Sequence, residues 1–178
     1  MGSVGLKFAT YSYYDPASHG VDFSGMVDDL KVAKLGDVVL LHGCCHNPSG
    51  ADLTLEQWSV IADMAIAQGF TVLVDLAYQG MGQGLAEDVA GLRLLATRLG
   101  ELIVAASCSK NLGLYRGRTG AALFYGKDTQ TAAATQSHGL GAARRVYSMP
   151  PAHGALLAGR VLSTVSYTHL RAHETIPD

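Results

Sequence analysis

Continuous apolar runs alternate with amphipathic stretches along the middle of the chain. The runs at residues 38–41, 70–74 and 102–106 are rich in valine, leucine and other apolar residues, a composition typical of strands covered on both faces. Between them, apolar residues recur at the spacing of one helix face. The order strand, helix, strand, helix, strand predicts an α/β fold with a largely parallel sheet flanked by helices.

Capping residues mark where the helices begin and end. Asp22 can cap a first helix, and Thr54 and Gln57 form a capping box for a second helix that stops at Gly69. Gly100 closes a third helix. The residues expected on the inner faces of these helices are Phe23, Met26, Val27, Leu30, Leu55, Trp58, Ile61, Ala62, Ala65, Ile66, Leu92, Leu95, Ala96 and Leu99.

Weaker patterns extend the prediction at both ends. Residues 8–14 have the composition of a strand, and residues 119–125 predict a further one. An alanine-rich helix is expected over residues 128–143, with Arg144 at its C-terminal end, where cations are favoured. A short apolar helix is expected over residues 155–162.

Composition limits the classes of function. The 178 residues, 48% hydrophobic and 16% charged, are enough for one globular domain. A net charge of −2 provides no basic surface for nucleic acid or an anionic membrane. No apolar run approaches the roughly 20 residues of a membrane span, residues 1–6 lack the charged and apolar pattern of a signal peptide, and three cysteines do not make a disulfide framework. We therefore expect a cytoplasmic protein without nucleic-acid or membrane partners.

Lys110 is the strongest candidate for chemistry. It follows the buried run at 102–106, and partial desolvation there lowers the pKa of an ammonium group and frees a nucleophilic lone pair. Ser107 and Ser109 before it and Arg118 after it can hold a phosphate beside the amine. An isolated Ser-x-Ser-Lys is more often an ordinary polar loop, so the assignment depends on partners elsewhere in the chain.

Such partners follow the other two strands. Asn47 comes shortly after the run at 38–41, and Asp75 directly follows the run at 70–74. Asp75 and Lys110 stand 35 positions apart, a spacing that suits one βαβ unit. Because ligands bind beyond the carboxyl ends of parallel strands, the sheet should bring an amide, a carboxylate and an amine to one rim.

The loop after the first buried run also contains four potential metal ligands, His42, Cys44, Cys45 and His46. Structural zinc sites usually combine two separated pairs of ligands, and nothing downstream supplies a second pair. We predict no metal site.

Four longer motifs stand in a consistent order and spacing: His46-Asn47-Pro48-Ser49-Gly50, Asp75-Leu76-Ala77-Tyr78-Gln79-Gly80, Ser107-Cys108-Ser109-Lys110-Asn111-Leu112-Gly113-Leu114-Tyr115 and Tyr147-Ser148-Met149-Pro150-Pro151-Ala152-His153-Gly154. Together they resemble the aspartate/aromatic (tyrosine) aminotransferases, which are fold-type I enzymes dependent on pyridoxal 5′-phosphate (PLP). The resemblance runs from about residue 5 to residue 164 and implies the large, PLP-binding domain of that fold.

The resemblance implies roles around the cofactor ring. Lys110 would form the internal aldimine and shuttle the proton between substrate Cα and cofactor C4′. Asp75 would pair with the pyridinium nitrogen and keep it protonated. Asn47 and Tyr78 would hydrogen-bond the phenolate oxygen.

It also implies roles in binding the phosphate and the substrate. Ser107, Ser109 and Arg118 would bind the phosphate, with Arg118 as a bidentate fork. Asn47 would also contact the substrate. Arg144 would reach into the neighbouring subunit's site and recognise a dicarboxylate side chain.

The implied activity is transamination between aspartate and/or an aromatic amino acid and a 2-oxo acid such as 2-oxoglutarate, by a homodimer. Met149 departs from the small polar residue that the family usually has before the two prolines. The family's glycine-rich phosphate loop and its arginine for the substrate α-carboxylate are missing. Residues 1–165 are therefore expected to be a partial large domain, truncated at both ends and inactive as a fragment. Residues 166–178 resemble translated adapter read-through and are expected to be a non-native tail.

Two other interpretations stay open. The chain can be a truncated, non-catalytic fold that binds PLP weakly at most. Ser107-x-x-Lys110 also matches the serine-acylase motif of penicillin-binding proteins, which requires the serine at the start of a helix.

Overall fold

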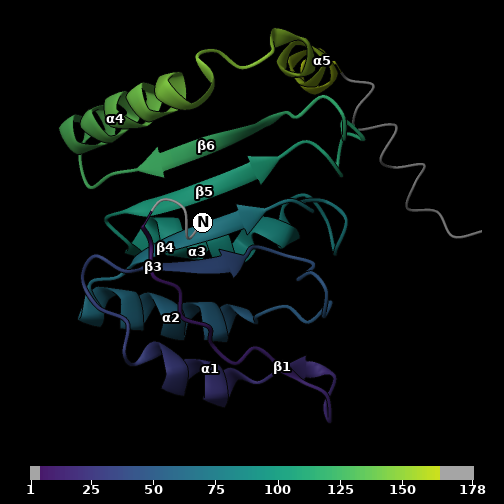
Figure 1. Cartoon of the computed structure of the whole chain (residues 1–178). Coiled ribbons are helices and arrows are strands. Elements are labelled where there is room, and N and C mark those ends of the chain that lie inside the picture. The colour runs from purple at the N-terminus through teal and green to yellow at the C-terminus, as the bar shows by residue number, and fades with distance from the viewer. Residues whose placement is uncertain (1–4, 165–178) are drawn as a thin grey trace, which may run out of the picture.

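A four-stranded sheet forms the centre of the computed structural model, which describes residues 5–164 (Figure 1). Its strands, in spatial order, are β3 (Val38–His42), β4 (Thr71–Leu76), β5 (Leu102–Ser107) and β6 (Gly120–Tyr125). Strands β3, β4 and β5 are parallel, and β6 runs antiparallel to β5. The predicted α/β fold with a largely parallel sheet is confirmed.

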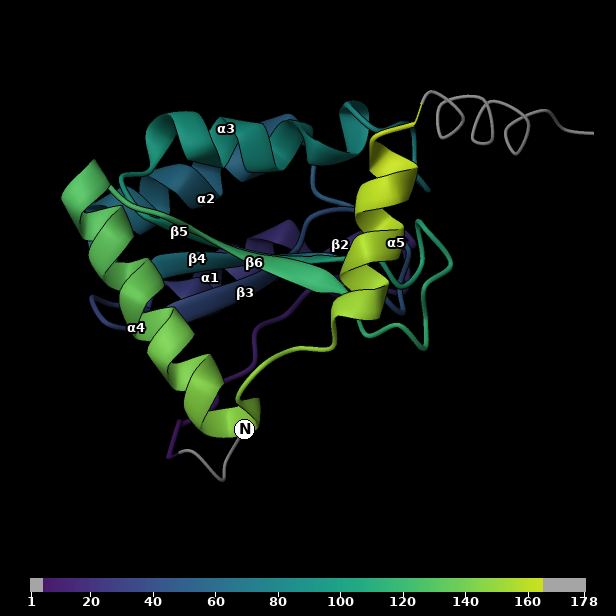
Figure 2. The same cartoon turned by 90° about the horizontal axis from the view of Figure 1, so that it is seen from above.

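Helices α2 (Leu55–Gln68) and α3 (Ala90–Arg98) cover one face of this sheet (Figure 2). Trp58 of α2 packs against Gly91 of α3, where any side-chain carbon would collide with the indole ring. The core lies between these helices and the sheet. Its most deeply buried members include Leu41, Ile61, Val72, Val74 and Leu95.

The predicted N-caps of the first two helices are present, and Gly69 ends α2 in a left-handed conformation (φ 79°). The prediction that Gly100 closes α3 is wrong, because α3 ends at Arg98 and its C-cap is Leu99 in an extended conformation. The Thr54 hydroxyl accepts a hydrogen bond from the backbone N–H of Gln57, whose side chain accepts one from the N–H of Thr54. Asp22 caps α1 (Phe23–Leu30) by accepting from the N–H of Gly25. Both helices therefore start where the sequence indicated.

The remaining elements lie at the two ends of the sheet (Figure 1). Helix α1 and the two-stranded ribbon of β1 (Tyr14–Asp15) and β2 (Gly20–Val21) lie beyond β3. Helices α4 (Thr129–Tyr147) and α5 (Ala152–Leu162) lie beyond β6. Within residues 5–164, no helix has the length and apolar character needed to cross a membrane.

The strand predicted over residues 8–14 is wrong except at Tyr14. Tyr11 and Tyr13 pack against the core from an irregular segment, and their hydroxyls donate to the carbonyls of Leu40 and Ala51. The alternation of aromatic and polar residues thus reflects packing of single side chains, not a hydrogen-bonded ladder.

Burial of β3 on both faces is also wrong. Val39 and Leu41 are buried under the helices, but Val38 and Leu40 on the other face are 55% and 39% exposed. On the helices, Leu55 and Ile66 are exposed although the pattern placed them inward.

The last two helices differ in length from the prediction. Helix α4 continues to Tyr147 and α5 already begins at Ala152. The break between them is confined to residues 148–151, because Pro150 and Pro151 cannot continue a helix that needs their N–H groups. The expectation of a non-native tail at 166–178 concerns residues outside the described range.

Asp88 organises the glycine-rich loop between β4 and α3. It lies in the 3-10 helix η2 (Glu87–Val89), is 7% exposed, and accepts four backbone hydrogen bonds of 2.7–3.3 Å. The donors are the N–H groups of Gly80, Gly82, Gln83 and Gly84. Burial raises the pKa of Asp88, but the four hydrogen bonds together outweigh burial, so the pKa lies below its ordinary value.

Replacing Asp88 with asparagine (D88N) should lower the free energy of unfolding at neutral pH by about 1–3 kcal/mol, because the amide has one acceptor oxygen and leaves partly buried N–H groups unsatisfied. Since the folded-state pKa is lowered, the carboxylate's contribution is fully present above the unfolded-state pKa and is lost as pH falls through the folded-state value. Urea unfolding at neutral and acidic pH measures both effects. The exposed neighbour Glu87 provides the control. If E87Q lowered the free energy of unfolding as much as D88N, the role assigned to Asp88 would be contradicted.

Candidate functional site

The carboxyl ends of the three parallel strands lie level with one another. His42 of β3 is opposite Asp75 of β4, and Asp75 is opposite Ala105 of β5. Side chains alternate along a strand, and Val74 and Leu76 are buried on the side of α2 and α3. His42 and Asp75 therefore share the other face of the sheet, and Asp75 is the penultimate residue of β4 rather than the residue after it.

Asn47, Tyr78 and Lys110 meet at this rim from three separate loops. The Asn47 side-chain amide donates to the Tyr78 hydroxyl at 3.4 Å. The Nζ atom of Lys110 lies 5.1 Å from the centroid of the Tyr78 ring, within cation–π range. Lys110 and Tyr78 are partly buried, and Asn47 is exposed. Of the three groups expected to converge, the amide of Asn47 and the amine of Lys110 thus meet at Tyr78. The third, the carboxylate of Asp75, lies at the same rim by strand register, and among the described residues it makes no hydrogen bond with them.

Ser107, Ser109 and Arg118 lie on two segments that are joined by the backbone. Ser107 ends β5 and accepts a hydrogen bond from the N–H of Ser109, and Cys108 donates to the carbonyl of Thr119 at 3.0 Å. Arg118 has left-handed backbone (φ 48°), and its exposed guanidinium donates to the carbonyl of Tyr115. Hydroxyl donors and a cation thus flank the turn that carries Lys110.

The position of Ser107 argues against the serine-acylase interpretation. That chemistry requires the serine at the start of a helix. Ser107 is instead the last residue of strand β5.

Arg144 lies in the exposed last turn of α4. Across residues 5–164, its side chain makes no hydrogen bond or ion pair. Because its predicted role belongs to a neighbouring subunit's site, that role stays a prediction.

Three residues to which the sequence assigned no role at this site, Asp52, Tyr13 and His42, hold the loop that carries Asn47. The Asp52 carboxylate accepts from the backbone N–H groups of Cys45 and His46 at 2.7 and 2.9 Å. The Tyr13 ring stacks on the His46 ring with centroids 3.8 Å apart. The backbone N–H of Asn47 donates to Nδ1 of His42, which places the proton of a neutral His42 on Nε2.

Burial sets the protonation states in this loop. It raises the pKa of Tyr13, assisted by Asp52 and Tyr11, so the hydroxyl stays protonated and donates to the carbonyl of Ala51. Burial and the neighbouring His42 lower the pKa of His46 against an opposing effect of Asp52, so a neutral ring stacks on Tyr13.

The four potential metal ligands of the sequence do not form one group. His42 and His46 pack ring against ring, with centroids 4.6 Å apart. Among the described residues, the ligand atoms that lie close together belong to Cys44, Cys45 and Asp88.

Comparison with known proteins gives one consistent family. The family model described as aminotransferase class I and II matches residues 2–175. The aromatic-amino-acid aminotransferase of Paracoccus denitrificans is 52% identical over 164 residues, and the aspartate aminotransferase of Escherichia coli K12 is 48% identical over 161 residues. These alignments cover 92% and 90% of this chain but only 42% and 41% of the relatives' own lengths.

Solved structures agree with the sequence relatives. An aromatic amino acid aminotransferase with 3-indolebutyric acid matches with a TM-score of 0.93 and 50% identity, covering 98% of this chain and 44% of that one. The Burkholderia pseudomallei aromatic-amino-acid aminotransferase, covalently bound to pyridoxal phosphate, matches with a TM-score of 0.92 and 34% identity over 97% of this chain and 43% of that one.

Replacing Asp52 with alanine (D52A) should loosen the loop that carries Asn47, because the N–H groups of Cys45 and His46 lose their acceptor. We expect faster hydrogen exchange at these two amides and a stability loss of about 1 kcal/mol. Amide exchange followed by mass spectrometry or NMR measures this effect. Asp37, which accepts from the N–H of Lys34, provides a control: D37A should leave the Cys45 and His46 amides unchanged, and equal acceleration would contradict the role of Asp52.

Proposed function

Because the chain belongs to the aminotransferase class I and II family, we propose that the protein transfers an amino group between an amino acid and a 2-oxo acid with PLP, and that Lys110 is its catalytic residue. The observation that carries the proposal is the meeting of Lys110, Tyr78 and Asn47 at the carboxyl end of the sheet. The relatives are named for aromatic amino acids and for aspartate, which supports one or both as substrates, with 2-oxoglutarate as a suitable acceptor.

The chain spans about two fifths of the length of these relatives. Activity, substrates and a homodimeric assembly are therefore proposed for the whole protein, located in the cytoplasm. We expect no turnover from this chain alone. Exposed apolar side chains on α4 and α5, such as Leu140, Tyr147 and Leu156, support an assembly partner at that end of the molecule.

The side chains at the rim match the groups of PLP by their chemistry. Asp75 offers a carboxylate that would keep the ring nitrogen protonated, because opposite charges favour each other's ionised form. Tyr78 and Asn47 offer hydrogen-bonding groups for the ring oxygen. When bound, PLP supplies an electron sink for the substrate's Cα–H bond.

Ser107, Ser109 and Arg118 would hold the phosphate. The Ser107 oxygen accepts from a backbone N–H and keeps its own O–H available as a donor. Arg118 has five side-chain N–H donors, and within residues 5–164 its guanidinium donates one hydrogen bond, to the carbonyl of Tyr115. A guanidinium with free donors suits bidentate recognition of phosphate oxygens.

Lys110 would act as the base and acid of the reaction. Its amine would accept the proton that leaves the substrate Cα and would return it to C4′ of the cofactor. Arg144 would bind a dicarboxylate substrate in the neighbouring subunit's site.

Borohydride reduction after addition of PLP tests the central assignment. We expect a stable phosphopyridoxyl group on Lys110, identified by peptide mapping and absent from the K110A variant. Exposed Lys127 offers a matched control, and K127A should keep the label. Label spread over surface lysines, or retained by K110A, would contradict the role of Lys110.

The expectation of no turnover has its own assay. The purified chain should show no aspartate:2-oxoglutarate transamination even when saturated with PLP. Measurable transamination that is lost in K110A would refute this expectation and support the catalytic role of Lys110.

A further inference from the structure

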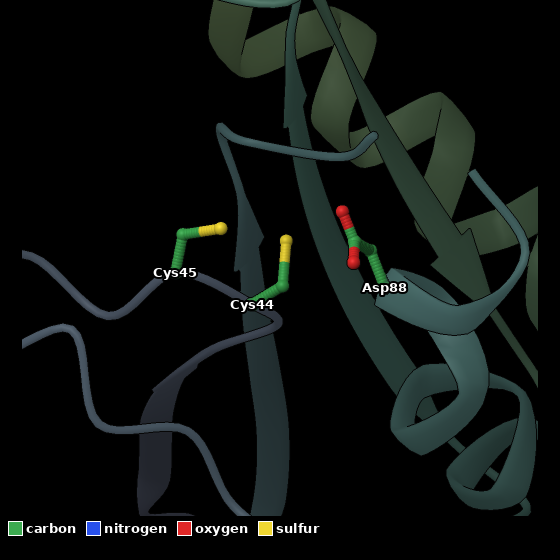
Figure 3. Close-up of side chains that lie close together, drawn as sticks. All are labelled: Cys44, Cys45 and Asp88. Carbon is green, nitrogen blue, oxygen red and sulfur yellow. The ribbon is translucent and has the colours of Figure 1, made fainter. Parts of the chain in front are cut away.

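Two adjacent cysteines in the loop after β3 form a dithiol that the proposed function does not use. Figure 3 shows the side chains of Cys44 and Cys45 on the part of this loop that neighbours Asp88. The two sulfur atoms and a carboxylate oxygen of Asp88 all lie within 4.8 Å of one another. Cys44 is 5% exposed and Cys45 is partly buried.

The backbone explains why the two thiols lie together. In an extended chain, consecutive side chains point to opposite sides. Cys45 has left-handed backbone (φ 49°), which breaks this alternation. The loop is held on both sides of the pair, because Gly43 donates to the carbonyl of Asp75 at 2.8 Å and Cys45 donates to Asp52. A Cβ atom at Gly43 would lie 2.8 Å from the Leu76 side chain and 3.1 Å from that of Val74, so a larger residue here would have to displace these side chains.

Asp88 does not complete a site for a divalent metal ion. An ionised carboxylate has about four lone-pair sites, and four backbone N–H groups already occupy them. A structural zinc site needs four ligands. Among the described residues of this cluster, only the two thiols have lone pairs that could bind a metal ion. The site therefore favours a ligand that two thiols satisfy by themselves.

We propose that Cys44 and Cys45 form a binding site for trivalent organoarsenic compounds. An arsenic oxide, R–As=O, condenses with the two thiols: two S–H bonds and the As=O bond break, two As–S bonds form, and both protons leave with the oxygen as one water molecule. Arsenic stays trivalent, so no oxidant or reductant is required. A pair of thiols held side by side closes the chelate without first bringing two distant chain segments together.

The electrostatic environment matches this chemistry. Burial, followed by the effects of Cys45 and Asp88, raises the pKa of Cys44 to about 12, and burial also raises the pKa of Cys45. Both groups are thus protonated thiols at neutral pH, the form that the condensation consumes.

Phenylarsine oxide tests the site on the chain without PLP. Intact-mass spectrometry should show a gain equal to the reagent minus one water molecule. This adduct should survive an excess of 2-mercaptoethanol, which removes arsenic held by a single thiol, and should be released by 2,3-dimercaptopropanol. K110A should behave like the unaltered chain, so this result is independent of the proposed aminotransferase function.

Single-cysteine variants identify the ligands. C44S and C45S should each lose the retained adduct, whereas C108S, which alters the third free cysteine, should keep it. Circular dichroism checks that each variant folds, and C44A provides a second test at the more buried position. Adduct retained by C44S and C45S, or formed by the unaltered chain only after denaturation in urea, would overturn the proposal.

Discussion

The register of the three parallel strands is the constraint on which the candidate site depends. His42, Asp75 and Ala105 are level across β3, β4 and β5, so the loops that follow these strands emerge at one edge of the sheet. The register is maintained by one buried face, formed by Val39, Val72 and their neighbours under α2 and α3. A slip by one residue would turn these side chains to the exposed face, so hydrophobic burial indirectly positions the polar rim.

Two carboxylates then shape the loops that emerge at this rim. Asp88 accepts hydrogen bonds from the N–H groups of Gly80, Gly82, Gln83 and Gly84. Asp52 accepts hydrogen bonds from those of Cys45 and His46. In each case a charged acceptor replaces the secondary structure that the loop lacks, since backbone N–H groups near the core need partners. The loop with Asn47 and the loop with Tyr78 are thereby ordered from within the chain.

The β6 edge of the sheet and the helix beyond it are much more exposed to solvent. Helix α4 has no buried residue among its described positions, and Leu123 and Tyr125 of β6 are about half exposed. Exposed apolar side chains in such number favour association with further protein surface. The proposed cofactor contacts are thus ordered within this chain, whereas the proposed substrate contact of Arg144 requires a neighbouring subunit.

The sequence by itself determined most elements, because caps and periodicity are local: Asp22, Thr54 and the apolar runs mark α1, α2 and the strands within a few residues. Four motifs likewise marked Lys110 and its partners before any contact was known. Only the tertiary structure decided that Tyr11 and Tyr13 pack as single side chains, that one face of β3 is exposed, and that Cys44 and Cys45 point together. These features depend on contacts between distant positions and on one left-handed residue, neither of which leaves a periodic signal in the chain.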